Sequence, residues 1–126
     1  MRYLLDTTVL IDQARGLAGA PELLASLFSE PNDLLTCDVV VAEALSGGSD
    51  REIEVVRAFV RSIEYVSTHP DAAAWAGETR RRLGQTIGRG LADAIIAGVA
   101  WFNDAIIVTR NPRDFEILGV RVLGYG

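Results

Sequence analysis

Four acidic residues of this sequence stand in unusually apolar surroundings, which makes them the first candidates for chemistry. Asp6 follows the apolar run Tyr3–Leu5, Glu43 lies within VVVAEAL, Asp93 lies within GLADAIIAGVAWF, and Asp114 comes shortly after the run AIIV. An unpaired carboxylate among apolar side chains is costly to bury. Several carboxylates brought together would repel one another unless a divalent cation joined them, and hard oxygen ligands with open water positions suit Mg²⁺ or Mn²⁺.

The chemistry that such a site offers is phosphodiester hydrolysis. A carboxylate-bound Mg²⁺ lowers the pKa of a bound water, aligns it with the phosphorus and stabilises charge on the leaving oxygen. This reaction needs no histidine. The only histidine of the chain, His69, lies beside Pro70 in an expected loop and is interpreted as a surface residue.

Each acid also has a purely structural explanation. Asp93 and Asp114 fall in the first turns of expected helices, where the helix dipole favours negative charge. Glu43 fits the exposed position of an otherwise buried helix. The structural explanation is weakest for Asp93, because its helix is apolar nearly all round and no basic residue occurs between Arg89 and Arg110.

The elements that must position these acids alternate between strand-like and helix-like patterns. Short apolar strands are expected at 2–6, 33–37, 64–68, 105–109 and 120–124, and helices at 21–30, 39–45, 50–63, 71–83, 91–102 and 112–118. Asp38, the Ser49 and Glu52 pair, and Asn111 are expected to cap helices. Strands interleaved with helices predict a three-layer α/β/α sandwich with a short, mostly parallel central sheet. Ligands of such sheets bind at the carboxyl ends of the strands, where Asp6 would lie.

Length and composition fit one domain over residues 1–126. The chain has 49% hydrophobic residues, no low-complexity tract and no internal repeat. The single cysteine, Cys37, cannot form an internal disulfide and is expected to be buried as a small apolar residue. No signal peptide is expected, because Asp6 interrupts the first apolar run, and no apolar stretch reaches the roughly 18 residues of a membrane span. A cytoplasmic location without membrane contact is the resulting expectation.

The charge of the chain excludes several functions. A net charge of −5 argues against coating nucleic acid by bulk attraction. The chain has no lysine, which excludes a Walker A loop, a Schiff base and a lysine-assisted aspartyl-phosphate site. Residues 77–126 nevertheless carry seven Arg against five Asp or Glu. A basic rim beside an acidic cleft would hold nucleic-acid phosphates, and a solvated helix face is the alternative explanation.

The segments that carry the four acids resemble the motifs of PIN-domain ribonucleases of the VapC toxin type, which occur in bacterial and archaeal toxin–antitoxin pairs. LLDTTVLID is similar to the opening strand and DT signature of that family, VVVAEAL to the helix with the second acid, LADAIIAGVA to the helix with the third, and VTRNPRDFEIL to the segment with the fourth. The resemblance runs nearly end to end. Pro112 departs from the last motif and fits a helix start.

Carried over position by position, the resemblance implies a catalytic cluster of acids that binds Mg²⁺ or Mn²⁺, formed by Asp6, Glu43, Asp93 and Asp114. The supporting polar residues would be Thr7, Thr109 and Asn111. The basic residues that would bind RNA are Arg80, Arg81, Arg82, Arg89, Arg110 and Arg113. Asp12 is expected to start a helix rather than to bind metal.

The function that the resemblance implies is a metal-dependent endoribonuclease, the toxin of a toxin–antitoxin pair, which cleaves RNA phosphodiester bonds with a metal-activated water. Its expected partners are the RNA substrate, a cognate antitoxin and a second copy of the chain in a homodimer. Two alternatives stay open. One is a catalytically silent PIN fold that binds RNA or protein, and the other is a DNA nuclease of the related flap-endonuclease group. Cleavage of RNA, of DNA or of neither separates the three.

Overall fold

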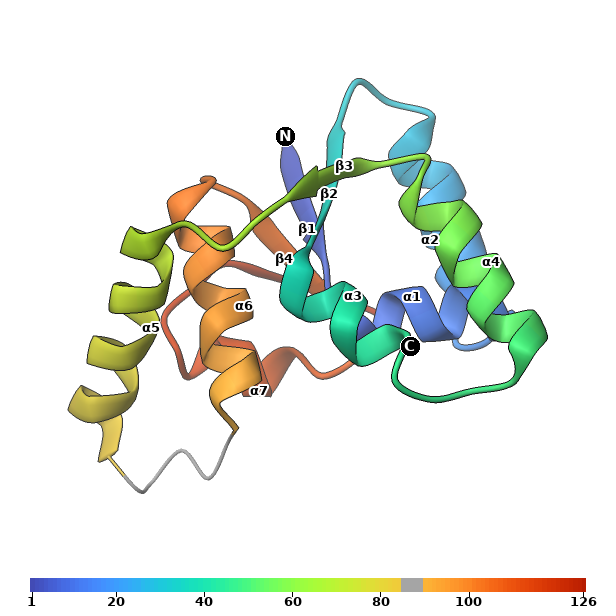
Figure 1. Ribbon diagram of the computed structural model, residues 1–126. Coiled ribbons are helices and arrows are strands. Elements are labelled where there is room, and N and C mark those ends of the chain that lie inside the picture. Colours follow the sequence, from blue (N-terminus) through green and yellow to red (C-terminus); the bar gives the residue numbers. More distant parts are fainter. Residues whose placement is uncertain (85–89) are drawn as a thin grey trace.

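A five-stranded parallel sheet forms the centre of the protein in a computed structural model, which describes residues 1–84 and 90–126 (Figure 1). The strand order is β3-β2-β1-β4-β5, and every neighbouring pair is parallel. The strands are β1 (Arg2–Leu5), β2 (Asp33–Cys37), β3 (Glu64–Val66), β4 (Ile106–Thr109) and β5 (Val122–Gly124). Parallel neighbours need crossover connections, which the helices supply.

Helices cover the sheet on both sides. They are α1 (Thr7–Arg15), α2 (Ala20–Phe28), α3 (Asp38–Ala44), α4 (Asp50–Val60), α5 (Pro70–Leu83), α6 (Leu91–Phe102) and α7 (Pro112–Glu116). α1 contacts α2, α3 and α4, whereas α6 contacts α5 and α7 (Figure 1). The expected three-layer α/β/α sandwich is confirmed. Among the described residues, no helix is both long and apolar enough to span a bilayer.

The core lies along the central strands. Leu4 and Leu5 of β1 pair in register with Ile107 and Val108 of β4, and all four are at most 1% exposed. Leu35 of β2 is fully buried on the other side of β1. Strands covered on both faces need apolar side chains at nearly every position, which explains why they read as continuous apolar runs.

The first helix was not predicted, because Thr7, Thr8 and Val9 are β-branched residues that continue the strand-like pattern of residues 2–6. In the structure the strand ends before Asp6 and α1 begins directly after it. Asp6 caps this helix by accepting a hydrogen bond from the Val9 N–H at 3.3 Å. The capping carboxylate therefore outweighs the strand propensity. Asp12, expected to start a helix, lies instead in the second turn of α1.

Other local predictions hold in part. Asp38, expected to cap the helix at 39–45, is the first residue of α3, and Cys37 is its N-cap. Ser49 caps α4 by accepting a hydrogen bond from the Glu52 N–H at 3.2 Å. The Glu52 side chain pairs with Arg15 at 2.9 Å, so only half of the expected capping box forms. Cys37 is buried and has no disulfide, and His69 is exposed at the start of α5, both as predicted.

The packing of α5 on α6 depends on Gly98, where a Cβ atom would overlap the carbonyl oxygen of Ala72. We expect Gly98→Ala to destabilise the fold. Overpacking costs about 1–3 kcal/mol of stability, and the upper end applies here because the added methyl group meets backbone. This cost exceeds the roughly 1 kcal/mol of stability that alanine gains over glycine in a helix.

Urea unfolding of matched variants tests this contact. Gly77 lies in α5 with nothing within 4 Å of a Cβ atom built there. Gly77→Ala should therefore stabilise the protein by up to about 1 kcal/mol, whereas Gly98→Ala should lower the unfolding midpoint. Equal midpoint shifts in the two variants would contradict the close approach of the helices.

Candidate active site

Asp6 lies at the carboxyl end of the central strand β1 and is only 4% exposed. Its Oδ1 accepts hydrogen bonds from the Thr8 hydroxyl at 2.6 Å and from the Val9 N–H at 3.3 Å. Burial raises the pKa of Asp6, while hydrogen bonds from Thr109, Thr8 and Val9 act to lower it. None of the ion pairs among residues 1–84 and 90–126 involves Asp6. A bound cation would offset the cost of its burial.

Glu43 reaches the same region from α3, which begins where β2 ends. The Thr7 hydroxyl donates to Oε1 of Glu43 at 2.7 Å, and Thr7 directly follows Asp6 in the chain. The start of α3 is held by Asp38, which accepts hydrogen bonds from the Thr68 N–H at 3.1 Å and the Thr68 hydroxyl at 2.7 Å. Burial acts to raise the pKa of Asp38, but the hydrogen bonds from Thr68 and from backbone N–H groups, including that of Val39, together lower it. The second acid therefore sits beside the first turn of α1.

The third and fourth acids lie in first turns, Asp93 in α6 and Asp114 in α7, and both are half-buried. The sequence predicted a deeper position for Asp93. The burial of α6 begins one residue later, at Ala94, so Asp93 occupies the partly open start of a buried helix. Because α6 contacts both α3 and α7, Asp93 lies on a helix that adjoins the helix of Glu43, and Asp114 lies on a helix that adjoins that of Asp93.

The carboxylate oxygens of these acids are suitable ligands for a hard divalent cation, but the acids do not form a preformed metal site. In the part of the chain that the structure describes, no three His, Cys, Asp or Glu side chains lie close enough together to hold a metal ion. Mg²⁺ usually keeps several waters and binds proteins through one or two carboxylates. An open site built around Asp6, with other acids acting directly or through water, fits this behaviour.

Two predicted supporting residues lie on the β4 side of Asp6. Thr109 is fully buried, and its side chain acts to lower the pKa of Asp6. The backbone N–H of Asn111 donates to the Thr109 hydroxyl at 3.0 Å. The Asn111 side chain is exposed and makes no capping bond to α7, although Asn111 and Pro112 start that helix as expected. Asn111 therefore supports the site through its backbone.

Most of the predicted RNA-binding arginines lie on two helices. Arg81 and Arg82 are exposed in the last turn of α5, and Arg113 is exposed on α7. Arg80 is half-buried in α5. Arg89 lies outside the described residues.

Sequence reasoning missed an ion pair behind the site, between a buried aspartate and a half-exposed arginine. Asp12 is 1% exposed, its Oδ1 lies 3.2 Å from Nη1 of Arg110, and its Oδ2 accepts a hydrogen bond from the Tyr125 hydroxyl at 2.8 Å. Burial, together with the Asp12 carboxylate, raises the pKa of the Tyr125 hydroxyl. The spacing of Val9 and Asp12, three residues apart on one helix face, would have signalled a buried acid had the helix been recognised.

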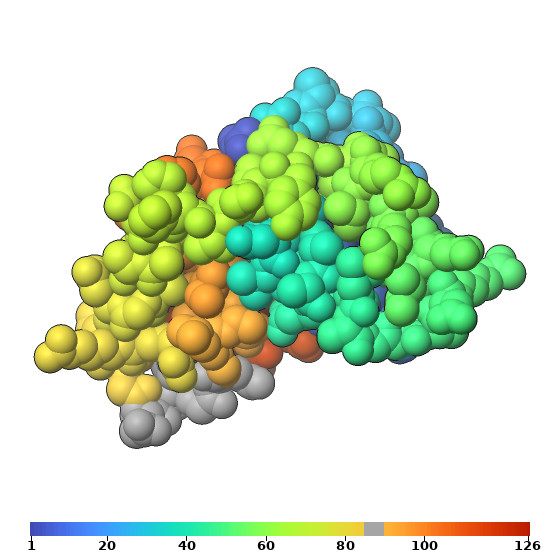
Figure 2. Space-filling view, in the orientation of Figure 1, coloured from blue at the N-terminus to red at the C-terminus, as the bar shows by residue number. Residues whose placement is uncertain are grey.

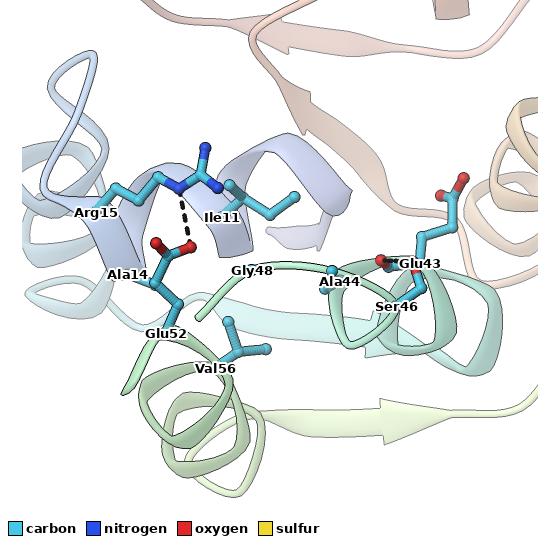
Figure 3. Close-up of a pocket in the computed structure, with 10 residues that line it drawn as sticks. Ile11, Ala14, Arg15, Glu43, Ala44, Ser46, Gly48, Glu52 and Val56 are labelled. Carbon is cyan, nitrogen blue, oxygen red and sulfur yellow. Dashed lines mark hydrogen bonds and ion pairs between the residues drawn. The ribbon is translucent and has the colours of Figure 1, made fainter. Parts of the chain in front are cut away.

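A pocket of about 260 Å³ lies beside Glu43 between α1, α3 and α4 (Figure 3). Ile11 and Val56 contribute apolar lining, and the Arg15–Glu52 ion pair lies at one end. Figure 3 shows the Glu43 carboxylate at the other end, pointing away from that pair. In the space-filling view, α3 fills the centre of this face between α4 and the α5–α6 pair (Figure 2). Glu43 therefore links the acidic site to an accessible pocket.

Comparisons with known proteins agree with this fold. The family model described as PIN domain matches residues 3–119. Ribonuclease VapC19 of Mycobacterium tuberculosis is 32% identical over 116 residues, which cover 90% of this chain and 92% of the relative. The chain therefore belongs to the PIN-domain family, and within it to the VapC ribonucleases, and the resemblance inferred from its motifs is confirmed.

Two further relatives extend this similarity. The tRNA(fMet)-specific endonuclease VapC of Shigella flexneri is 28% identical, with 94% of this chain and 93% of the relative covered. Among solved structures, a chain of VapBC2 from Rickettsia felis bound to a promoter DNA fragment matches with a TM-score of 0.84 at 22% identity, with all of both chains covered. At this identity the structural match shows a shared fold.

Proposed function

We propose that this chain is a metal-dependent endoribonuclease that acts in the cytoplasm as the toxin of a toxin–antitoxin pair, with residues 1–126 forming one PIN domain. The observation that carries the proposal is Asp6, a buried carboxylate at the carboxyl end of the central strand. Among the described residues it has hydrogen-bond donors but no ion-pair partner. Perturbed carboxylates in such positions are typical of functional sites.

Mg²⁺ or Mn²⁺ would be held by oxygen ligands from the four acids, Asp6, Glu43, Asp93 and Asp114. When bound, the ion supplies an activated water and charge stabilisation at the leaving oxygen. Around it, the Thr8 hydroxyl and the Val9 N–H fix the Asp6 carboxylate, and the Thr7 hydroxyl orients Glu43.

The RNA would be held by arginines beside these acids. Arg81, Arg82 and Arg113 are exposed. Contacts between arginine and phosphate oxygens do not depend on base sequence. Hydrolysis at phosphorus then leaves a 5′-phosphate and a 3′-hydroxyl. A chain of net charge −5 needs local positive charge to approach RNA, and these arginines supply it.

The proposed regulatory partner is a cognate antitoxin, and the proposed active form is a homodimer. An acidic site in an acidic protein favours a partner that presents a basic side chain. The pocket beside Glu43 offers apolar lining for a neighbouring side chain of the same partner.

Incubation of the purified protein with labelled total RNA and with single-stranded DNA, each in Mg²⁺, Mn²⁺ or EDTA, tests the proposal. We expect RNA to be cut in either metal, to carry 5′-phosphate ends, and to stay intact in EDTA. Cleavage of DNA alone would instead indicate a nuclease of the flap-endonuclease group. Binding of RNA without cleavage in any metal would favour a silent docking module.

A further inference from the structure

A continuous chain of polar contacts links the buried Asp12 to Asp6. The Tyr125 hydroxyl and the Arg110 guanidinium both bind the Asp12 carboxylate, at 2.8 and 3.2 Å. The backbone N–H of the same Arg110 donates to the Thr8 hydroxyl at 3.1 Å, and Thr8 donates to Oδ1 of Asp6 at 2.6 Å. These residues come from α1, from the segment after β4 and from the segment after β5. Three distant parts of the sequence therefore meet beside Asp6.

The hydrogen bonds at Thr8 run in one direction. The Arg110 backbone N–H donates to the Thr8 hydroxyl, and the Thr8 hydroxyl donates its proton to Oδ1 of Asp6. Asp6 is the acceptor on this side, which suits an ionised carboxylate. The position of the Arg110 backbone consequently sets the orientation of the Thr8 hydroxyl, and through it that of the Asp6 carboxylate.

The Arg110 backbone is in turn held by its own side chain and by the segment after β5. Because Asp12 is 1% exposed, its carboxylate depends on Arg110 and Tyr125 in place of water. The Tyr125 N–H donates to the Thr109 carbonyl at 3.3 Å, next to Arg110 in the chain. Gly126 also packs on Arg110, since a Cβ atom built there would lie 3.3 Å from its Cγ.

We propose that Asp12, Arg110 and Tyr125 are positioning residues, which hold the Asp6 carboxylate in the orientation that binds the divalent ion. This inference rests on the proposed function and deepens it. It also reassigns Arg110, which the sequence placed among the RNA-binding residues, because its guanidinium is engaged with a buried carboxylate. Removing the hydrogen-bond partners of metal ligands typically weakens metal binding about 10–100-fold.

The test measures Mn²⁺ affinity by calorimetry and RNA cleavage for the wild type, Tyr125→Phe, Asp12→Asn and Arg110→Met. We expect each variant to bind Mn²⁺ about tenfold more weakly. At fixed Mn²⁺, kcat should fall while KM for RNA stays unchanged, and excess Mn²⁺ should restore cleavage. Tyr125→Phe removes one hydroxyl and nothing else, which makes it the variant with the smallest effect on folding.

Matched controls separate positioning from charge and from stability. The Asp104–Arg121 pair is an ion pair at 2.7 Å with both side chains more than half exposed. Asp104→Asn and Arg121→Met should leave Mn²⁺ affinity unchanged. Leu24→Ala, which opens a cavity under α2, controls for lost stability. Asp12→Asn and Arg110→Met act through one contact, so their effects on Mn²⁺ affinity should not add. The double variant should bind Mn²⁺ as weakly as the more affected of the two single variants.

The outcomes distinguish the inference from the proposed function. If Arg110→Met raises KM for RNA while its Mn²⁺ affinity matches the wild type, the inference is wrong and Arg110 contacts RNA. If the wild type cleaves RNA while Tyr125→Phe and Asp12→Asn bind Mn²⁺ normally, the positioning role is wrong and the nuclease stands. A wild type that neither binds Mn²⁺ nor cleaves RNA defeats the proposed function and the inference together.

Discussion

Replacing Asp6 by asparagine is expected to slow RNA cleavage more than about 100-fold, because removal of groups that merely support a metal ligand already costs about 10–100-fold and Asp6 is the proposed ligand itself. Asparagine keeps the shape of the side chain and caps helices as well as aspartate does. The fold should therefore persist. Single-turnover cleavage in Mg²⁺ measures the effect, and a rate within tenfold of the wild type would contradict the assignment of Asp6.

The same substitution tests the cost of burying Asp6. Burial raises the pKa of Asp6, so in the metal-free protein the folded state holds this proton more tightly than the unfolded chain does. The stability that this proton contributes is present below the pKa of Asp6 in the unfolded chain. It is lost as the pH rises through the pKa of Asp6 in the folded protein. Asp6→Asn abolishes that loss, so the metal-free variant should gain stability relative to the wild type between pH 4 and pH 7.

Urea midpoints at these two pH values in EDTA measure this gain. Asp104→Asn is the matched control, because the Asp104 side chain is 94% exposed and its replacement removes no buried charge. Added Mg²⁺ should stabilise the wild type and leave Asp6→Asn unchanged, since a ligand stabilises only the state that binds it. An Asp6→Asn protein that is less stable than the wild type at pH 7 without metal would show that Asp6 is not destabilising.

The ion pair between the buried Asp12 and the half-exposed Arg110 should respond unequally to the loss of its two members. Arg110→Met leaves the Asp12 carboxylate, only 1% exposed, without its cation. Removing one partner of a buried pair costs about 3–5 kcal/mol, and we expect the lower end because Tyr125 still donates to Asp12. Asp12→Asn leaves an arginine whose side chain is 45% exposed and can turn to water, so the loss should be about 1–2 kcal/mol.

Urea unfolding at pH 7 compares the two variants. Arg121→Met is the control for loss of an exposed ion pair and should change stability by less than about 0.5 kcal/mol. If Asp12→Asn lowers the free energy of unfolding as much as Arg110→Met does, or more, then the Asp12 carboxylate does not need the Arg110 cation to remain buried.

The sheet and most helices could be predicted because their signals are local. The apolar run before Thr109 and the long apolar segment of α6 lie where the sequence placed them. The first helix could not be predicted, because Thr7, Thr8 and Val9 favour strands, whereas the capping bond from Val9 to Asp6 and the burial of Val9 and Leu10 favour the helix. Secondary-structure propensity therefore gave the wrong prediction directly after Asp6, the residue on which the proposed function depends.

The candidate site could likewise be predicted from the sequence only in part. Four acids in apolar surroundings and their family motifs are visible in the sequence, but the contacts that arrange them are not. Thr7 and Glu43 are 36 residues apart, and Tyr125 and Asp12 are 113 residues apart. Such pairs are set by strand order and crossovers rather than by neighbouring residues. For the same reason Arg110 reads as a surface cation in sequence and is an ion-pair partner in the fold.

The most direct test of the central claim is the location of Mn²⁺ in crystals, measured where manganese scatters anomalously. We expect an anomalous peak about 2.0–2.3 Å from an oxygen of Asp6, with Glu43, Asp93 and Asp114 next to the ion or to its waters. A peak away from Asp6, or none in crystals of a preparation that cleaves RNA with Mn²⁺, would contradict a metal centre at the carboxyl end of β1.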